Sequence, residues 1–155
     1  MKRNTWAVLA GFILICLVVG GIAGAITAPS VDGWYASINK PSWNPPNRVF
    51  GPVWTVLYVM MAVAAWLVWR TVNNTRTAMI LFFCQLALNF GWSVMFFGVK
   101  SPGLGLAEVI LFWLVLLATT LVFFRKSKFA GALMLPYLAW VSFAAFLNFT
   151  IWRLN

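Results

Sequence analysis

Five long apolar stretches follow one another along the chain, separated by short segments that hold most of the basic residues. They lie at about residues 5–27, 49–69, 77–99, 103–124 and 129–152. A helix needs about 20 residues to cross the hydrocarbon core of a bilayer, and it satisfies its own backbone hydrogen bonds there. The strands of a membrane barrel would alternate apolar and polar positions, whereas these stretches do not. The pattern predicts an all-α integral membrane protein, a five-transmembrane-helix bundle forming one domain over residues 1–155.

The first stretch has a second interpretation. Lys2 and Arg3 precede it, and the small residues from Gly24 to Ala28 resemble the cleavage site of a signal peptide. The apolar core of a signal peptide is only about 7–15 residues long. The greater length of this stretch favours a retained helix.

The composition narrows the functional classes. Of the 155 residues, 63% are apolar and 8% are charged, which leaves too few polar groups for the surface of a soluble domain. Two acidic residues and no histidine argue against metal hydrolases, Ser-His-Asp triads, paired-carboxylate catalysis and coordinated haem. Cys16 and Cys84 lie inside apolar stretches, so neither a disulfide framework nor a zinc site is expected. We expect no metal and no obligatory cofactor.

The net charge of +9 would suggest a nucleic-acid partner in a soluble protein, but here the basic residues lie between the apolar stretches. Seven Lys and Arg flank the side of the N-terminus, and four (Lys40, Arg48, Lys100 and Arg153) flank the other side. The positive-inside rule therefore predicts a cytoplasmic N-terminus and an external C-terminus. Membrane lipid, not nucleic acid, is the expected surrounding. The expected location is the bacterial cell membrane, with the outer membrane as the alternative.

The longest connection, residues 28–48, is rich in proline and aromatic residues. Proline fixes φ and removes a backbone donor, so a stiff, irregular segment is expected. Its aromatic residues are Trp34, Tyr35 and Trp43. Two interpretations stay open: they anchor the chain at the membrane interface, or they belong to a lid over a binding site.

In four of the predicted spans, candidate residues lie in the half of the bilayer that is nearest to this connection. The candidate residues at that level are Phe50, Trp54, Tyr58, Asn89, Trp92, Phe96, Glu108, Trp140, Phe143, Ala144, Leu147 and Asn148. Trp54 and Tyr58 are four residues apart, as are Trp140 and Ala144, so each pair shares a helical face. The cluster favours a pocket for a large, flat, apolar ligand. The alternative is that these aromatics fill the core or form an interface belt.

The polar and small residues inside the spans each have two interpretations. Glu108 is the only acidic residue within a predicted span, which makes it a functional candidate, unless it pairs with Lys100 or reaches water at the interface. Asn89 and Asn148 fit hydrogen bonds between helices somewhat better than ligand contacts. Small residues four apart, from Gly20 to Gly24 and from Ala87 to Gly91, favour close helix approach within the bundle or across a dimer.

At these residues the chain resembles the TspO family, the tryptophan-rich sensory proteins related to the mitochondrial translocator protein (peripheral benzodiazepine receptor). The matching segments are Trp34-Tyr35 with Lys40-Pro41-Ser42-Trp43-Asn44-Pro45-Pro46; Phe50-Gly51-Pro52-Val53-Trp54 through Tyr58; Gln85 through Trp92; and Leu135-Pro136-Tyr137 through Trp140, continuing to Asn148 and Trp152-Arg153. The resemblance spans nearly the whole chain, and the loop motif of spaced proline and tryptophan is specific.

The resemblance implies a five-helix bundle, often a homodimer, with a pocket closed by the first loop. It implies porphyrins and haem precursors, isoquinoline-carboxamide-type drugs and, in animals, cholesterol as ligands. Some bacterial members are reported to degrade protoporphyrin in light and oxygen through two pocket tryptophans, which correspond to Trp54 and Trp140 as candidate catalytic residues. The animal sterol motif falls on Leu147, Phe149 and Arg153, where Phe149 lacks the expected hydroxyl group.

We therefore expect a membrane protein that binds tetrapyrroles, such as protoporphyrin IX or haem, in an intramembrane aromatic pocket for sensing, transport or disposal. Lys40, Arg48 and Lys100 lie on the side of the pocket, where cations suit propionate groups. The alternatives are light-driven breakdown of the bound porphyrin, transport of sterol or lipid, and modulation of partner membrane proteins.

Overall fold

The computed structural model of the chain describes residues 4–71 and 74–155. Its helices are α1 (Thr5–Val31), α2 (Trp34–Ser37), α3 (Asn47–Thr71), α4 (Arg76–Ser93), the π-helical η1 (Val94–Gly98), α5 (Pro102–Lys126) and α6 (Lys128–Leu154). Among the described residues, five helical segments are long and apolar enough to cross a membrane, with α4 and η1 together forming the third. This architecture confirms the predicted class, a helical membrane bundle.

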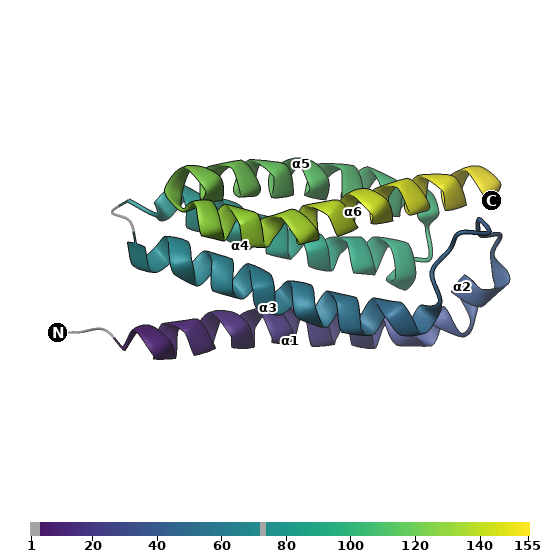
Figure 1. The fold of residues 1–155 in the computed structure, drawn as a ribbon. Coiled ribbons are helices and arrows are strands. Elements are labelled where there is room, and N and C mark those ends of the chain that lie inside the picture. The colour runs from purple at the N-terminus through teal and green to yellow at the C-terminus, as the bar shows by residue number, and fades with distance from the viewer. Residues whose placement is uncertain (1–3, 72–73) are drawn as a thin grey trace.

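The long helices form a closed ring in which each packs mainly against two neighbours. α1 packs against α3 and α4, α6 packs against α3 and α5, and α5 completes the ring by packing against α4. The helices run side by side along one axis, and the start of α1 and the end of α6 lie at opposite ends of the bundle (Figure 1). The short helix α2 lies at the end that holds the C-terminus, so the 28–48 connection lies beside the last turns of α6.

The outer surface of the ring is apolar along its length. Leu14, Val56, Ile80, Leu114 and Phe146, from five different helices, are all exposed large hydrophobic side chains. An apolar surface of this extent is unsuited to water, whereas lipid tails match it. The surface is therefore consistent with a bundle embedded in a bilayer.

Many fully buried side chains lie in the half of the bundle away from α2. Phe82, Phe123, Met134 and Val68 are fully buried there, from four different helices. In this half α5 and α6 are joined through the single residue Ser127, whose side-chain oxygen accepts a hydrogen bond from the Ala130 N–H at 3.3 Å and so caps α6. This half of the bundle therefore forms a continuous buried core.

Two details differ from the expectations. The irregular segment expected over 28–48 contains more helix, because α1 continues through Pro29 to Val31 and α2 follows. A proline in the last turns removes only one backbone bond, and the Ser30 hydroxyl holds this turn by donating to the Phe97 carbonyl at 2.7 Å. The third span ends in a π-helix, where the Val99 N–H donates to the Val94 carbonyl at 2.7 Å. Hydropathy carries no signal for such a turn.

The orientation in the membrane stays a prediction. Two of the seven cations on the N-terminal side, Lys2 and Arg3, lie outside the described residues. The other five lie in the last turns of α3 and α5 and at the first residues of α4 and α6, at the end of the bundle away from α2.

Candidate ligand cavity

A cavity of about 590 Å³ lies in the half of the bundle that carries α2. Residues from α1, α2, α3, α4, η1 and α6 line it. Ten of the residues proposed from the sequence are on its wall, namely Tyr35, Phe50, Trp54, Tyr58, Asn89, Trp92, Phe96, Ala144, Leu147 and Asn148. The structure thus brings most of the predicted cluster together around one space.

Aromatic rings from four elements form a connected part of this wall. The ring centroid of Trp54 on α3 lies 5.8 Å from that of Tyr58 and 6.2 Å from that of Trp92 on α4. Trp92 is 5.9 Å from Phe96 on η1, which is 6.1 Å from Tyr35 on α2. The rings meet in tilted and edge-on arrangements, the preferred geometry of aromatic pairs. Together they offer π faces to a flat ligand.

The polar groups of the wall are mostly engaged in hydrogen bonds between helices. The Tyr58 hydroxyl donates to Asn89 Oδ1 at 2.6 Å, and Asn89 Nδ2 donates to the Tyr137 hydroxyl at 2.7 Å. Asn148 Oδ1 accepts from Trp92 Nε1 at 3.0 Å, and its Nδ2 donates to the Pro102 carbonyl at 2.8 Å. Asn89 and Asn148 therefore form hydrogen bonds between helices, which is the role that the sequence favoured for them. Both also line the cavity.

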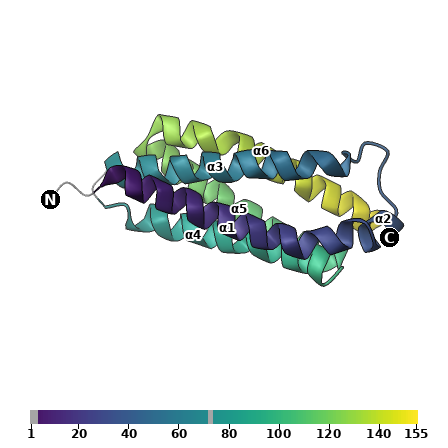
Figure 2. The ribbon, with the colours of Figure 1, turned by 90° about the horizontal axis from the view of Figure 1, so that it is seen from below.

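Along one side the cavity is bounded by small residues. Gly21, Gly24 and Ala28 of α1 and Gly51 and Thr55 of α3 line it and are exposed. A Cβ atom added at any of these three glycines would meet no other atom within 4 Å. Seen from below, α1 and α3 separate toward the end of the bundle that carries α2 (Figure 2). The cavity therefore opens sideways between α1 and α3, toward lipid.

At its end the cavity is bordered by the 28–48 connection. The Tyr35 hydroxyl is buried and donates to Asn44 Oδ1 at 2.8 Å, and burial raises the pKa of Tyr35 to about 12 against the opposing effect of this bond. Lys40 Nζ donates to the carbonyls of Tyr35 at 2.6 Å and Ile38 at 2.9 Å. Asn39 exchanges hydrogen bonds with Asn155, its N–H donating at 3.0 Å and its carbonyl accepting at 2.9 Å. These bonds fix the connection against the end of α6.

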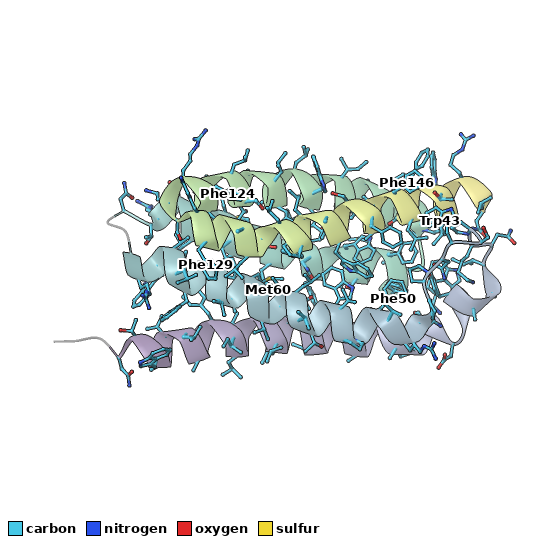
Figure 3. All side chains as sticks on the ribbon, in the orientation of Figure 1. Trp43, Phe50, Met60, Phe124, Phe129 and Phe146 are labelled. Atoms are coloured by element: carbon cyan, nitrogen blue, oxygen red, sulfur yellow. The ribbon has the colours of Figure 1, made fainter. Side chains whose placement is uncertain are left out.

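Four of the predicted aromatic residues lie outside the wall. Trp34 packs edge-on against Phe96 at 5.6 Å, and Trp43 stacks on Phe146 at 5.3 Å on the outer side of α6. Figure 3 shows Trp43 and Phe146 side by side at the end of the bundle that also holds Phe50. Trp140 and Phe143 contact each other at 5.6 Å, and Trp140 touches the wall residue Phe50 at 5.9 Å. Trp140 thus packs against a wall residue but does not itself line the cavity.

Glu108 is the fifth predicted residue that is not on the cavity wall. Its Oε1 packs at the α4–α5 contact, where a Cβ atom on Gly91 would come within 2.7 Å of it. Its buried Oε2 has no hydrogen-bond partner among the described residues, so the alternative of pairing with Lys100 is not seen. The small residue Gly91 accommodates a side chain of α5 here, which is internal packing.

The reasoning from sequence missed the contribution of α1. Leu17, Gly20, Gly24 and Val31 line the cavity and are spaced three, four and seven residues apart, on one helical face. From the sequence alone, the spacing of Gly20 and Gly24 predicts a surface for helix packing. That holds for Gly20, where a Cβ atom would collide with the ring of Tyr58, but not for Gly24. A stripe of small residues on an otherwise bulky helix was the available signal.

The fold and this site define a multi-pass helical membrane protein with an aromatic cavity inside the bilayer. A model of the TspO/MBR family matches residues 12–153, so the chain belongs to that family and the resemblance is confirmed.

Relatives from bacteria and animals align over most of the chain. It is 47% identical to the tryptophan-rich protein TspO of Chlorobaculum tepidum over 152 residues, which cover 95% of each chain. It is 40% identical to the tryptophan-rich sensory protein of Cereibacter sphaeroides over 150 residues, 97% of this chain and 92% of the relative. It is 41% identical to the translocator protein of Homo sapiens over 126 residues, 79% and 75% of the two chains.

Proposed function

We propose that the protein binds a tetrapyrrole in this cavity, to sense, carry or dispose of it within the membrane. The observation that carries the proposal is the connected aromatic wall around a space of about 590 Å³. Sites for ligands of this size class measure roughly 300–1,000 Å³ and are mostly apolar with a few polar groups. A macrocycle with two flat faces suits such a wall, and it partitions into lipid, to which the cavity opens.

Trp54 is the residue of the wall best placed to contact a macrocycle. Its half-buried ring touches those of Tyr58 and Trp92 and lines the cavity from α3. An aromatic contact contributes about 0.5–1.5 kcal/mol beyond the burial of area, which corresponds to a change of roughly two- to twelvefold in Kd. Replacing this ring therefore has a measurable expected effect.

The test is a titration of purified protein in detergent micelles with protoporphyrin IX, followed by quenching of tryptophan fluorescence. We expect saturable quenching, and a Kd about two- to twelvefold higher for Trp54→Ala. Trp6→Ala is the matched control, because Trp6 is 70% exposed and lies at the end of the bundle away from the cavity. Unchanged fluorescence at tens of micromolar protoporphyrin would remove the proposal.

A second candidate is light-driven oxidation of the bound porphyrin by molecular oxygen. It is favoured by the oxidisable rings around Trp54, which has Tyr58, Trp92 and Tyr137 within 6.2 Å. Under aerobic illumination the porphyrin absorption band should decay, more slowly in Trp54→Phe than in the wild type. Trp140→Phe should have the smaller effect, because Trp140 contacts the wall residue Phe50 but does not line the cavity itself. Equal decay in all three proteins would argue against catalysis.

Sterol or lipid transport is less supported by the positions of the corresponding residues. Leu147 lines the cavity, whereas Phe149 is 44% exposed on the outside of α6 and Arg153 is exposed at its end. The three do not face a common site. For the host membrane we propose the bacterial cell membrane, since proteins of the outer membrane type cross it as barrels and this chain forms helices.

A further inference from the structure

The charges at the end of the cavity are unevenly placed. Asp32, the residue that follows α1, is exposed and lines the cavity. Among the described residues that line it, none is a lysine or an arginine. A carboxylate is thus the only full charge on the described wall, in a chain with eleven basic and two acidic residues.

The cations expected to meet the acidic groups of a ligand do not line the cavity. Lys40 donates to the carbonyls of Tyr35 and Ile38, and its Nζ lies 5.0 Å from the centre of the Tyr35 ring, so it is held behind the wall. Arg48 and Lys100 are exposed and do not line the cavity. Because both side chains are exposed, salt screens their attraction for a ligand in the cavity.

Two helix ends also border this end of the cavity. The C-terminal end of α1, next to Asp32, carries a partial negative charge, and the N-terminal end of α3, at the lining residue Asn47, carries a partial positive one. Each amounts to about half an elementary charge. Because each of these partial charges is smaller than a full charge, the carboxylate of Asp32 is the largest single charge on the described wall.

We propose that Asp32 is a specificity-determining residue of the cavity, which lowers the affinity for ligands that place a carboxylate at this opening relative to neutral ligands of the same shape. The preferred ligand class is a flat macrocycle or amphiphile whose edge at Asp32 is uncharged. This inference rests on the proposed tetrapyrrole-binding function. It predicts that, of two tetrapyrroles of the same shape, Asp32 favours the one without a carboxylate at this end of the cavity.

The test compares protoporphyrin IX, which has two carboxylates, with its neutral dimethyl ester. Kd is measured for both by tryptophan quenching at low salt, and the ratio of the two values is compared among variants. The ratio within one variant cancels general effects on fold or cavity shape, as in a double-mutant cycle. We use Asp32→Asn, which keeps the shape and removes the charge, and Asp32→Glu, which keeps the charge.

For Asp32→Asn we expect the ratio of the acid Kd to the ester Kd to fall about three- to tenfold, as for two charges roughly 6–8 Å apart in a partly aqueous setting. Asp32→Glu should keep the wild-type ratio. Glu108→Gln is the matched control, because it removes the other acidic side chain, which is not on the wall, and its ratio should stay within about twofold of the wild-type value. The effect of Asp32→Asn should shrink in about 1 M salt, where the Debye length is about 3 Å.

The outcomes separate this inference from the proposed function. An unchanged ratio in Asp32→Asn, with both ligands still binding, overturns the role of Asp32 and leaves tetrapyrrole binding intact. An equal fall in Glu108→Gln also overturns it, because the effect would then follow net charge and not position. If neither porphyrin quenches the wild-type protein, the proposed function fails and this inference fails with it.

Discussion

Removing the hydroxyl of Tyr137 should destabilise the bundle more than removing that of Tyr58. Tyr137 is fully buried, and its hydroxyl accepts from Asn89 Nδ2 and donates to Gln85 Oε1, each at 2.7 Å. In Tyr137→Phe, the donor Asn89 Nδ2 and the acceptor Gln85 Oε1 both lose the hydroxyl as a hydrogen-bond partner. In Tyr58→Phe only Asn89 Oδ1 loses one, since the Tyr58 hydroxyl makes a single bond as donor.

Two estimates bound the expected loss in the free energy of unfolding for Tyr137→Phe. Leaving a buried polar group without a partner costs about 1–3 kcal/mol in soluble proteins, which gives roughly 2–6 kcal/mol for two groups. Hydrogen bonds between transmembrane helices average only about 0.6 kcal/mol, which gives roughly 1.2 kcal/mol for two. The lower bound reflects an unfolded state in which polar groups in the membrane also find partners. Because Gln85 is fully buried, we expect about 2 kcal/mol for Tyr137→Phe and about half of that for Tyr58→Phe.

The assay is reversible unfolding in mixed micelles with increasing mole fraction of sodium dodecyl sulfate, followed by circular dichroism. The free energies of unfolding of the wild type and the two variants are compared under one set of conditions. Tyr35→Phe is a suitable control, because its hydroxyl bonds to Asn44 in the connection and not between transmembrane helices. A loss for Tyr137→Phe that does not exceed that for Tyr58→Phe would refute the reasoning.

Three further predictions follow from the geometry. Gly105→Ala should lower the free energy of unfolding in the same assay by about 1–3 kcal/mol, since its Cβ would lie 2.9 Å from the ring of Phe96. Gly24→Leu should weaken porphyrin binding at least severalfold in the quenching titration, because it fills the side opening. Gly11→Leu, which also meets open space but lies away from the cavity, should not. With its pKa raised to about 12 by burial, Tyr35 should make the folded state less stable as the pH rises from about 10 to 12, and in Tyr35→Phe this part of the pH dependence should be lost.

The sequence was sufficient to predict the spans, because length and hydropathy alone decide whether a helix can cross lipid. It was less informative about where helices end. α1 continues past Pro29 because a tertiary contact, the bond from Ser30 to the Phe97 carbonyl, holds its last turn. In the π-helical turn at Val94–Gly98, Phe96 packs against the rings of Tyr35 and Trp92, contacts that no local pattern of the sequence indicates.

For the cavity, the sequence predicted which residues share one half of the bilayer but not which way each helix is rotated. Trp54 faces the cavity and Trp140 does not, although both belong to aromatic clusters at similar depth. A helix that is apolar on all sides has no polar face to indicate its rotation. The same limit applies to Glu108, which faces Gly91. The polar bonds and close contacts that set these rotations are visible only in the assembled bundle.

The space inside the bundle follows from the way membrane helices associate. Lipid tails are as apolar as the helix surfaces, so no hydrophobic force closes a gap, and close packing depends on small residues and polar bonds. At Gly20 the missing side chain admits the ring of Tyr58, whose hydroxyl is then held by Asn89. At Gly24, which also lines the cavity, no atom lies within 4 Å of the position of a Cβ, so the space there stays open. The hydrogen bond that stabilises the bundle therefore also keeps Tyr58 from swinging into the cavity, and Tyr58→Phe should lower stability and alter ligand affinity together.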